Sequence, residues 1–175
     1  LTAHQTGSND FGGPNFDPTI EAVLQFTNGT GAGQADILWA DERTINASSN
    51  DDLDLAGVLA DAFGTTVAAV ELVAIMVVAA ATNTNNVVVG AATNPVPLFG
   101  GTSPTVPVKP GGVLLLAAQN AAGLATVTAS TGDILRVANS GSGSTVTYKI
   151  AVLARTAAAI VRFATSAPCE ALSVS

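Results

Sequence analysis

Residues 134–154, ILRVANSGSGSTVTYKIAVLA, carry the signal that decides the fold class. Residues 134–138 and 145–154 are rich in Ile, Leu, Val and Thr, and the turn-forming stretch NSGSG at residues 139–143 separates them. Aliphatic and β-branched runs bounded by such turn residues are typical of β-strands. We therefore predict that the two runs are strands that pair as an antiparallel hairpin.

The same alternation of aliphatic runs and turn residues extends over most of the chain. The predicted strands are residues 20–27, 35–40, 43–47, 67–81, 86–91, 106–109, 113–118, 125–129, 134–138 and 145–154. About 8–10 strands at this spacing are typical of two-layered or closed β structures. The predicted fold is all-β, a single jelly-roll-like β-sandwich or barrel.

The sequence Lys109-Pro110-Gly111-Gly112 has the signature of a type II turn. Proline suits the second position of that turn, and glycine suits the third, where φ must be positive. We expect this turn to close a hairpin that leads into the run at residues 113–118.

Two segments do not read simply as strands. Residues 53–63, LDLAGVLADAF, break the two-residue period and follow Asp51 and Asp52, which are good helix N-caps, so we expect a short helical turn that ends at Gly64. Residues 67–81 form an apolar run that suits either a buried helix or a long buried strand. The many valines in this run favour the strand.

A chain of 175 residues is long enough for one domain with a sizeable core. Residues 1–18 are rich in Gly, Asn, Asp and Pro and show no sustained period, which predicts an extended N-terminal arm. The β-sandwich domain is expected over residues 19–155. Residues 156–175 are expected to form a C-terminal extension, either a strand or an interface arm.

The chain is unusually poor in charge, since charged residues make up 11% of it and hydrophobic residues 48%. Typical soluble domains are about 25% charged. A surface of small uncharged residues suits contacts with other subunits. A net charge of −7 with six scattered Lys and Arg argues against nucleic-acid binding. The longest apolar run, residues 67–81, is too short for a membrane-spanning helix and contains Glu71.

The sequence offers little material for catalysis. His4 is the one histidine and lies in the predicted arm, where it cannot serve an ordered catalytic triad. Cys169 has no second cysteine for a disulfide or a zinc site, which suits assembly in a bacterial cytoplasm. The acidic stretch at residues 51–61 lacks the spacing of a calcium loop. We predict no enzymatic activity, no catalytic residues, no metal site and no cofactor.

Trp39 and Tyr148 are the only large amphipathic aromatic residues, and each lies in a predicted strand. If exposed, such rings anchor a protein partner or stack on a sugar. The alternative for both is packing in the core. Together with Arg43 they are the candidate interface residues.

Several turn and strand motifs recur together between residues 20 and 155. They are QAD (34–36) with DERT (41–44), DLDLAG (52–57) with DAFG (61–64), NTNNVVVG (83–90), KPGG (109–112), and GDIL (132–135) through AN (138–139) to VTY (146–148). As a set they resemble a group of small proteins encoded among the structural genes of tailed bacteriophages. The resemblance implies a virion component and supplies no catalytic residues. Residues after 155 depart from the short ending of that group.

The leading hypothesis is a capsid decoration or cement protein on the capsid surface. Its partners would be the major capsid protein and further copies of itself, in a homotrimer. A tail, fibre-base or head-spike structural protein is the first alternative. A glycan-binding module on the particle, using Trp39 or Tyr148, is the second.

Overall fold

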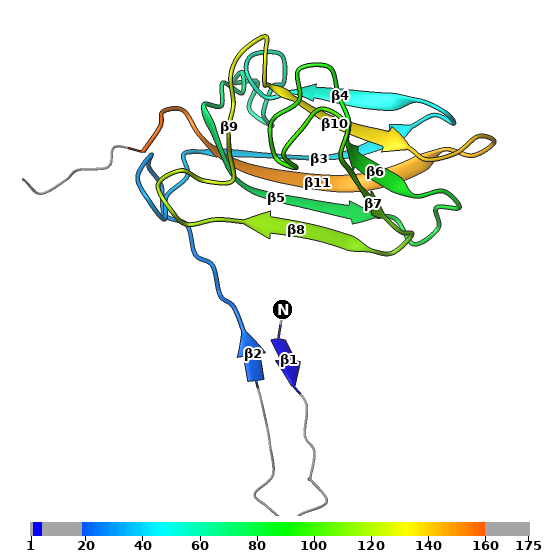
Figure 1. Cartoon of the computed structure of the whole chain (residues 1–175), viewed down its shortest axis with the longest axis horizontal. Helices are drawn as coiled ribbons and strands as arrows, with labels where there is room; N and C mark the ends of the chain where they lie inside the picture. Colours follow the sequence, from blue (N-terminus) through cyan, green and yellow to red (C-terminus); the bar gives the residue numbers. More distant parts are fainter. Residues whose placement is uncertain (1, 5–18, 160–175) are drawn as a thin grey trace, which may run out of the picture.

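The computed structural model describes residues 2–4 and 19–159, and the regular structure within them consists of strands alone. The strands are β1 (Thr2–His4), β2 (Thr19–Glu21), β3 (Ile37–Ile45), β4 (Asn50–Asp54), β5 (Glu71–Ala79), β6 (Val87–Gly90), β7 (Thr105–Val108), β8 (Val113–Ala117), β9 (Ala125–Thr126), β10 (Ile134–Asn139) and β11 (Val146–Arg155). Strands β3 to β11 form two sheets that lie one above the other (Figure 1). The prediction of an all-β fold is confirmed.

The two sheets contain strands that are far apart in the sequence. The five-stranded sheet has the order β3-β11-β5-β8, and β9 pairs with the start of β5. The four-stranded sheet has the order β4-β10-β6-β7, and every pairing in both sheets is antiparallel. Apart from β6–β7 and β8–β9, each connection between successive strands passes from one sheet to the other.

The core lies between the inner faces of the two sheets. In β10 every second residue is buried, and β11 and β6 alternate in the same way. This alternation follows from the pleat, which directs successive side chains to opposite faces of a strand. Leu53, Val89 and Val137 of the four-stranded sheet and Ile75 and Ile150 of the five-stranded sheet belong to one buried cluster.

The predicted hairpin between residues 134–138 and 145–154 is wrong, although both strands exist. Strand β10 pairs with β4 and β6, whereas β11 pairs with β3 and β5 in the opposite sheet. Both runs have a buried face, and two strands on opposite sides of a core bury those faces against each other. The Gly- and Ser-rich loop therefore spans the sandwich instead of closing a hairpin.

The side chain of Asn139 holds the crossing between β10 and β11 in place. Its amide nitrogen donates to the carbonyls of Ser144, at 2.7 Å, and Asn46, at 3.2 Å. Its amide oxygen accepts from the backbone N–H of Gly141 and from the side chain of Asn85. One buried side chain thus connects three loops at this end of the sandwich.

The turn at residues 109–112 has the predicted conformation but joins the wrong strands. Gly111 has a φ of 73°, and the N–H of Gly112 donates to the carbonyl of Lys109 at 2.7 Å. The strands on either side, β7 and β8, belong to different sheets. The turn is therefore a second crossing between the sheets, and the predicted hairpin is wrong.

The helical turn predicted over residues 53–63 is also wrong. Strand β4 includes Leu53 and Asp54, and the residues that follow form turns. The carboxylate of Asp54 accepts from the N–H of Ala56, and that of Asp61 accepts from the N–H groups of Phe63 and Thr65. These aspartates stabilise local turns, which compete with a helix.

Residues 67–81 contain the long strand β5, as the valines indicated. A shift in its register with β11, between Leu153 and Ala154, leaves an extra residue near Val73. Such a bulge changes which face the following side chains occupy. Leu72 and Ile75 therefore both reach the core, which hides the two-residue period.

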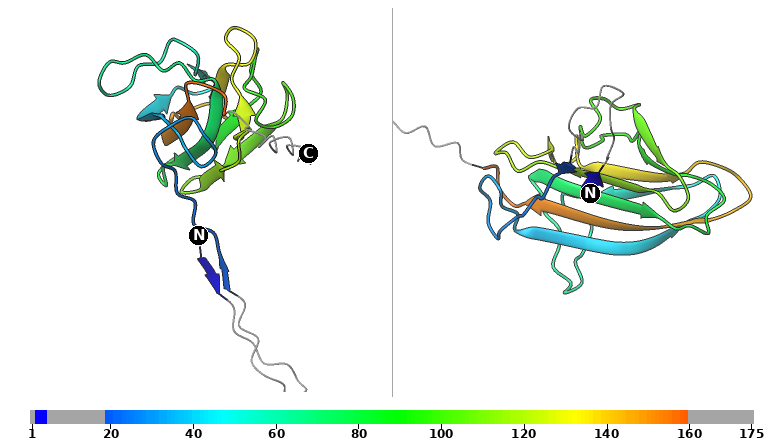
Figure 2. Two further views of the ribbon diagram at one scale, coloured as in Figure 1. Left: turned by 90° about the vertical axis from the view of Figure 1, so that its left-hand side faces the viewer. Right: turned by 90° about the horizontal axis from the view of Figure 1, so that it is seen from below.

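Residues 20–27 do not form the predicted strand. Thr19–Glu21 pairs with Thr2–His4 in a separate two-stranded ribbon, and Thr27 makes only an isolated bridge with Gln34. In Figures 1 and 2 this ribbon stands away from the sandwich, on the side of the five-stranded sheet. The rest of the predicted arm, residues 5–18, and the extension from residue 160 lie outside the described residues.

A buried ion pair connects the end of β11 to the start of β5. Arg155 and Glu71 are both buried, and Nη1 of Arg155 donates to Oε2 of Glu71 at 2.7 Å. The guanidinium also donates to the carbonyls of Gln34, Asn120 and Ala121 at 2.9, 3.1 and 3.0 Å. Arg155 therefore supplies the hydrogen bonds of three loop carbonyls as well as the counter-charge of Glu71.

We expect Arg155→Met to lower the free energy of unfolding by about 3–5 kcal/mol, because Glu71 would remain buried without its counter-charge. Urea denaturation measures this loss. The matched control is Lys149→Met on the same strand, whose exposed pair with Glu42 spans 3.4 Å and is worth about 0–1 kcal/mol. Equal losses in the two variants would contradict a structural role for the buried pair.

Candidate assembly interface

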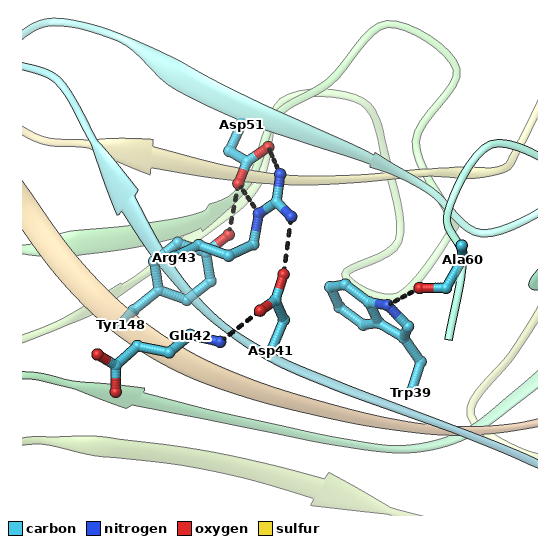
Figure 3. Close-up of polar contacts among 7 residues, drawn as sticks. All are labelled: Trp39, Asp41, Glu42, Arg43, Asp51, Ala60 and Tyr148. Carbon is cyan, nitrogen blue, oxygen red and sulfur yellow. Dashed lines mark hydrogen bonds and ion pairs between the residues drawn. The ribbon is translucent and has the colours of Figure 1, made fainter. Parts of the chain in front are cut away.

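Three side chains from both sheets meet at the open side of the sandwich between β3 and β4 (Figure 3). Arg43 of β3 donates to both carboxylate oxygens of Asp51 in β4, from Nε at 2.5 Å and from Nη2 at 3.1 Å. Tyr148 of β11 donates its hydroxyl to the same carboxylate at 2.9 Å, and Arg43 also pairs with Asp41 at 2.9 Å. Asp51 therefore connects the four-stranded sheet to the five-stranded one.

The environment keeps each donor of this group protonated. Burial raises the pKa of the Tyr148 hydroxyl, and the charge of Asp51 raises it further. The hydrogen bond to Asp51 raises the pKa of Arg43, against the opposing effect of burial. At neutral pH the Tyr148 phenol is therefore an O–H donor and the Arg43 guanidinium is a cation. Both can bind the Asp51 carboxylate and so connect the two sheets.

The three candidate interface residues lie in different settings. Trp39 is buried in the core, where its Nε1–H donates to the carbonyl of Ala60 at 3.1 Å, and Tyr148 is fully buried (Figure 3). Neither ring offers a face to a sugar, so the structure does not support them as a stacking surface. Arg43 is partly exposed and lines a polar cavity of about 490 Å³ between β3 and β4.

The described part of the chain shows no cluster of three or more His, Cys, Asp or Glu side chains that could hold a metal ion. Residues 2–4 and 19–159 likewise include no helix with the length and apolarity needed to cross a membrane. Cys169 lies beyond the described residues.

The outer face of the five-stranded sheet is apolar. The side chains opposite the core on this sheet form what we call the apolar face, namely Leu38, Ala40, Ala74, Met76, Val78, Val113, Leu115, Ala117, Ala151 and Leu153. Leu38, Val113 and Leu115 are 65%, 60% and 59% exposed. At one end of β3 and β11 the outward positions are polar. Glu42 and Lys149 pair there at 3.4 Å, and the hydroxyls of Thr44 and Thr147 share a hydrogen bond of 3.1 Å.

The apolar face is as large as the largest apolar patch of a typical monomer, and such patches are often functional. Its ten residues lie on four adjacent strands about 4.8 Å apart and cover about 300–400 Å². A contiguous patch with its one ion pair at the rim is also the usual anatomy of a protein interface.

The outer face of the four-stranded sheet is more charged, although Val88, Pro107, Ile134 and Ala138 also point outward on it. Arg136 of β10 donates to both oxygens of Asp52 in β4, at 2.6 and 2.7 Å, and this hydrogen bonding lowers the pKa of Asp52. Asn50 and Thr105 are exposed on the same face. The two outer faces of the sandwich therefore differ in their charge.

The sequence prediction missed the apolar face, although one signal pointed to it. The run VLLLA at residues 113–117 is apolar at every position, as is typical of a strand that is covered on both faces. Leu114 and Leu116 pack against the core, whereas Val113 and Leu115 point outward. In the described chain nothing covers those outward residues, which makes them the best evidence for a partner.

No protein family model matches this chain, and no curated protein matches its sequence.

We expect Tyr148→Phe to lower the free energy of unfolding by about 1 kcal/mol, the usual worth of one buried hydrogen bond. The control is Thr147→Val, whose exposed hydroxyl shares a 3.1 Å hydrogen bond with Thr44. Thermal or urea denaturation measures both variants. A Tyr148→Phe variant as stable as the parent protein would show that Asp51 does not need this donor.

The Asp52–Arg136 pair predicts a stability difference that depends on pH. The folded protein holds the pKa of Asp52 below its ordinary value of 3.8, so the pair stabilises the fold above that pH and loses its effect as the pH falls through the folded pKa. Because the pair is partly exposed, we expect Asp52→Asn to cost less than about 1 kcal/mol at pH 7. Urea denaturation at pH 7 and pH 3 would show this cost shrinking in acid, and an equal cost at both pH values would contradict the assignment.

Proposed function

We propose that this protein is a non-enzymatic structural component of a tailed-bacteriophage virion, and specifically a capsid decoration or cement protein. It binds the major capsid protein on the capsid surface, through the apolar face. The observation that carries the proposal is the contrast between the apolar outer face of the five-stranded sheet and the charged outer face of the four-stranded sheet.

The strand order supports a jelly-roll interpretation of the sandwich. Numbered from β3 and without the short β9, the eight strands fall in the orders 1-8-3-6 and 2-7-4-5. These orders match those of a jelly roll, in which a folded ribbon of strand pairs wraps around one core, and so favour that interpretation. Jelly rolls occur in viral capsid proteins and also in lectins. The fold alone does not choose between them, so the choice depends on the surface.

The burial of Trp39 and Tyr148 favours binding to a capsid protein over binding to a glycan. A sugar-binding site needs an exposed aromatic face beside polar groups, whereas the apolar face carries neither exposed aromatic residues nor a row of polar side chains. A broad, nearly flat apolar surface instead fits another protein surface. The ribbon of β1 and β2 stands on the same side, where it adds contact with whatever covers the face (Figure 1).

The small area of the apolar face favours binding of many copies to a capsid lattice over binding to one isolated partner. Stable interfaces bury about 800 Å² on each partner, roughly twice what the apolar face offers. A weak contact becomes effective when many copies bind one shell and when linked subunits raise the local concentration of one another. A homotrimer on a capsid lattice meets that condition.

The protein would stabilise the capsid by thermodynamic linkage between its own binding and the assembly state of the lattice. A subunit that binds the mature lattice and not its precursor or dissociated forms shifts the equilibrium toward the lattice by its binding free energy. No chemical step is required, and the charged outer face of the four-stranded sheet would be turned to solvent.

The direct test is co-sedimentation of the purified protein with phage heads from which it has been removed. We expect binding at many copies per head and at a fixed ratio to the major capsid protein. A handful of copies would instead indicate a tail, fibre-base or head-spike position, and no binding would refute the decoration role.

Leu115→Asp tests the face itself. A carboxylate in place of this exposed leucine should weaken binding to the heads about 100-fold, because binding would then lose apolar contact and remove water from a charge. The matched control is Thr105→Asp on the outer face of the four-stranded sheet, which should bind like the parent protein. Since both positions are exposed, neither change should lower the melting temperature.

A further inference from the structure

The loop between β4 and β5 presents the most exposed large apolar side chain of the described residues. This loop, residues 55–66, projects from the sandwich in both views of Figure 2 and is called the Phe63 loop here. Phe63 at its tip is 94% exposed, and Val58 is 76% exposed. A phenyl ring held in water has a strong tendency to be buried in a partner.

The tip of the Phe63 loop is rigidly constructed. The carboxylate of Asp61 accepts from the N–H groups of Phe63 and Thr65 at 2.9 and 2.8 Å, and the N–H of Gly64 donates to the carbonyl of Asp61 at 3.0 Å. Gly64 has a φ of 81°, a conformation that favours glycine. Because the tip is already ordered, binding through Phe63 would cost little conformational entropy.

The base of the loop is fixed to the core. The indole of Trp39 donates to the carbonyl of Ala60 at 3.1 Å, and the N–H of Val67 donates to the carbonyl of Leu59 at 2.8 Å. The loop therefore keeps a set position relative to β3. It presents Phe63 away from the surface instead of folding it back.

A cavity of about 180 Å³ lies beside the base of the same loop. Its lining is mixed: Ile37, Leu38, Val67 and Ala68 are apolar, whereas Asp36, Asp61, Thr65, Thr66 and Thr156 are polar. A cavity of about 150 Å³ is large enough to bind benzene, so this one has room for a single phenyl ring against its apolar side. Leu38 also belongs to the apolar face, so the cavity opens beside it.

We propose that the Phe63 ring of one copy of this chain occupies the cavity beside β3 of a second copy. Each copy then provides one ring and one cavity, which is what a closed assembly of identical subunits requires. The contact is reciprocal between two copies or continues around a small ring. This inference does not depend on the capsid proposal, because self-association is measured in the absence of heads.

The contact area of one ring and its surroundings is small, so association should be weak and should depend on concentration. We expect sedimentation velocity of the full chain to show a closed oligomer at up to about 100 μM. Phe63→Ser should raise the dissociation constant at least tenfold without changing the melting temperature. Val58→Ser, at the other exposed apolar position of the loop, should change it less than threefold.

Ala68→Trp tests the cavity from the other side, because an indole at this exposed position would fill the space for the ring. It should weaken association as much as Phe63→Ser, and the double variant should be no weaker than either single variant, since both changes remove the same contact. The proposal is overturned by a parent protein that stays monomeric throughout. It is also overturned by equal effects of Phe63→Ser and Val58→Ser, or by an Ala68→Trp variant that associates like the parent.

Discussion

The packing of the two inner sheet faces against each other is the constraint on which the rest of the structure depends. Strands on either side of one core cannot all pair with their neighbours in sequence, so most connections from β3 to β11 pass between the sheets. Buried and half-buried polar side chains support these crossings. Asn139 organises the loops at one end, Asp51 connects β4 to Arg43 and Tyr148, and Arg155 supplies hydrogen bonds to three loop carbonyls.

The two outer faces show what the protein does with its surface once the core is formed. A sheet with one face in water normally alternates apolar and polar residues, as β4 does with Asp52 and Leu53. On the five-stranded sheet most outward positions are apolar as well, with Leu38, Met76 and Leu115 in adjacent rows. This arrangement is unfavourable for an isolated monomer and is understandable if a partner covers the face.

Trp39 is a core residue that also positions a surface loop. Its ring is part of the core, yet its N–H holds the carbonyl of Ala60 and so positions the Phe63 loop. The cavity beside this loop shares Leu38 with the apolar face. Contacts between copies and contacts with a lattice would therefore be continuous, and linked subunits bind a lattice more tightly than separate ones.

The sequence by itself determined the all-β class, most of the core strands and the conformation of the turn at Gly111, because these depend on local propensity and on neighbouring residues. It divided β3 (Ile37–Ile45) into two strands and missed β4 (Asn50–Asp54), whose aspartates also suit a helix start. Only the tertiary structure decided which strands pair. The runs around residues 134–154 and the turn at residues 109–112 suit a hairpin and a crossing between sheets equally well, and long-range burial makes the choice. The apolar face depends on the same choice, since four strands from distant parts of the chain must meet before Leu38 and Leu115 form one surface.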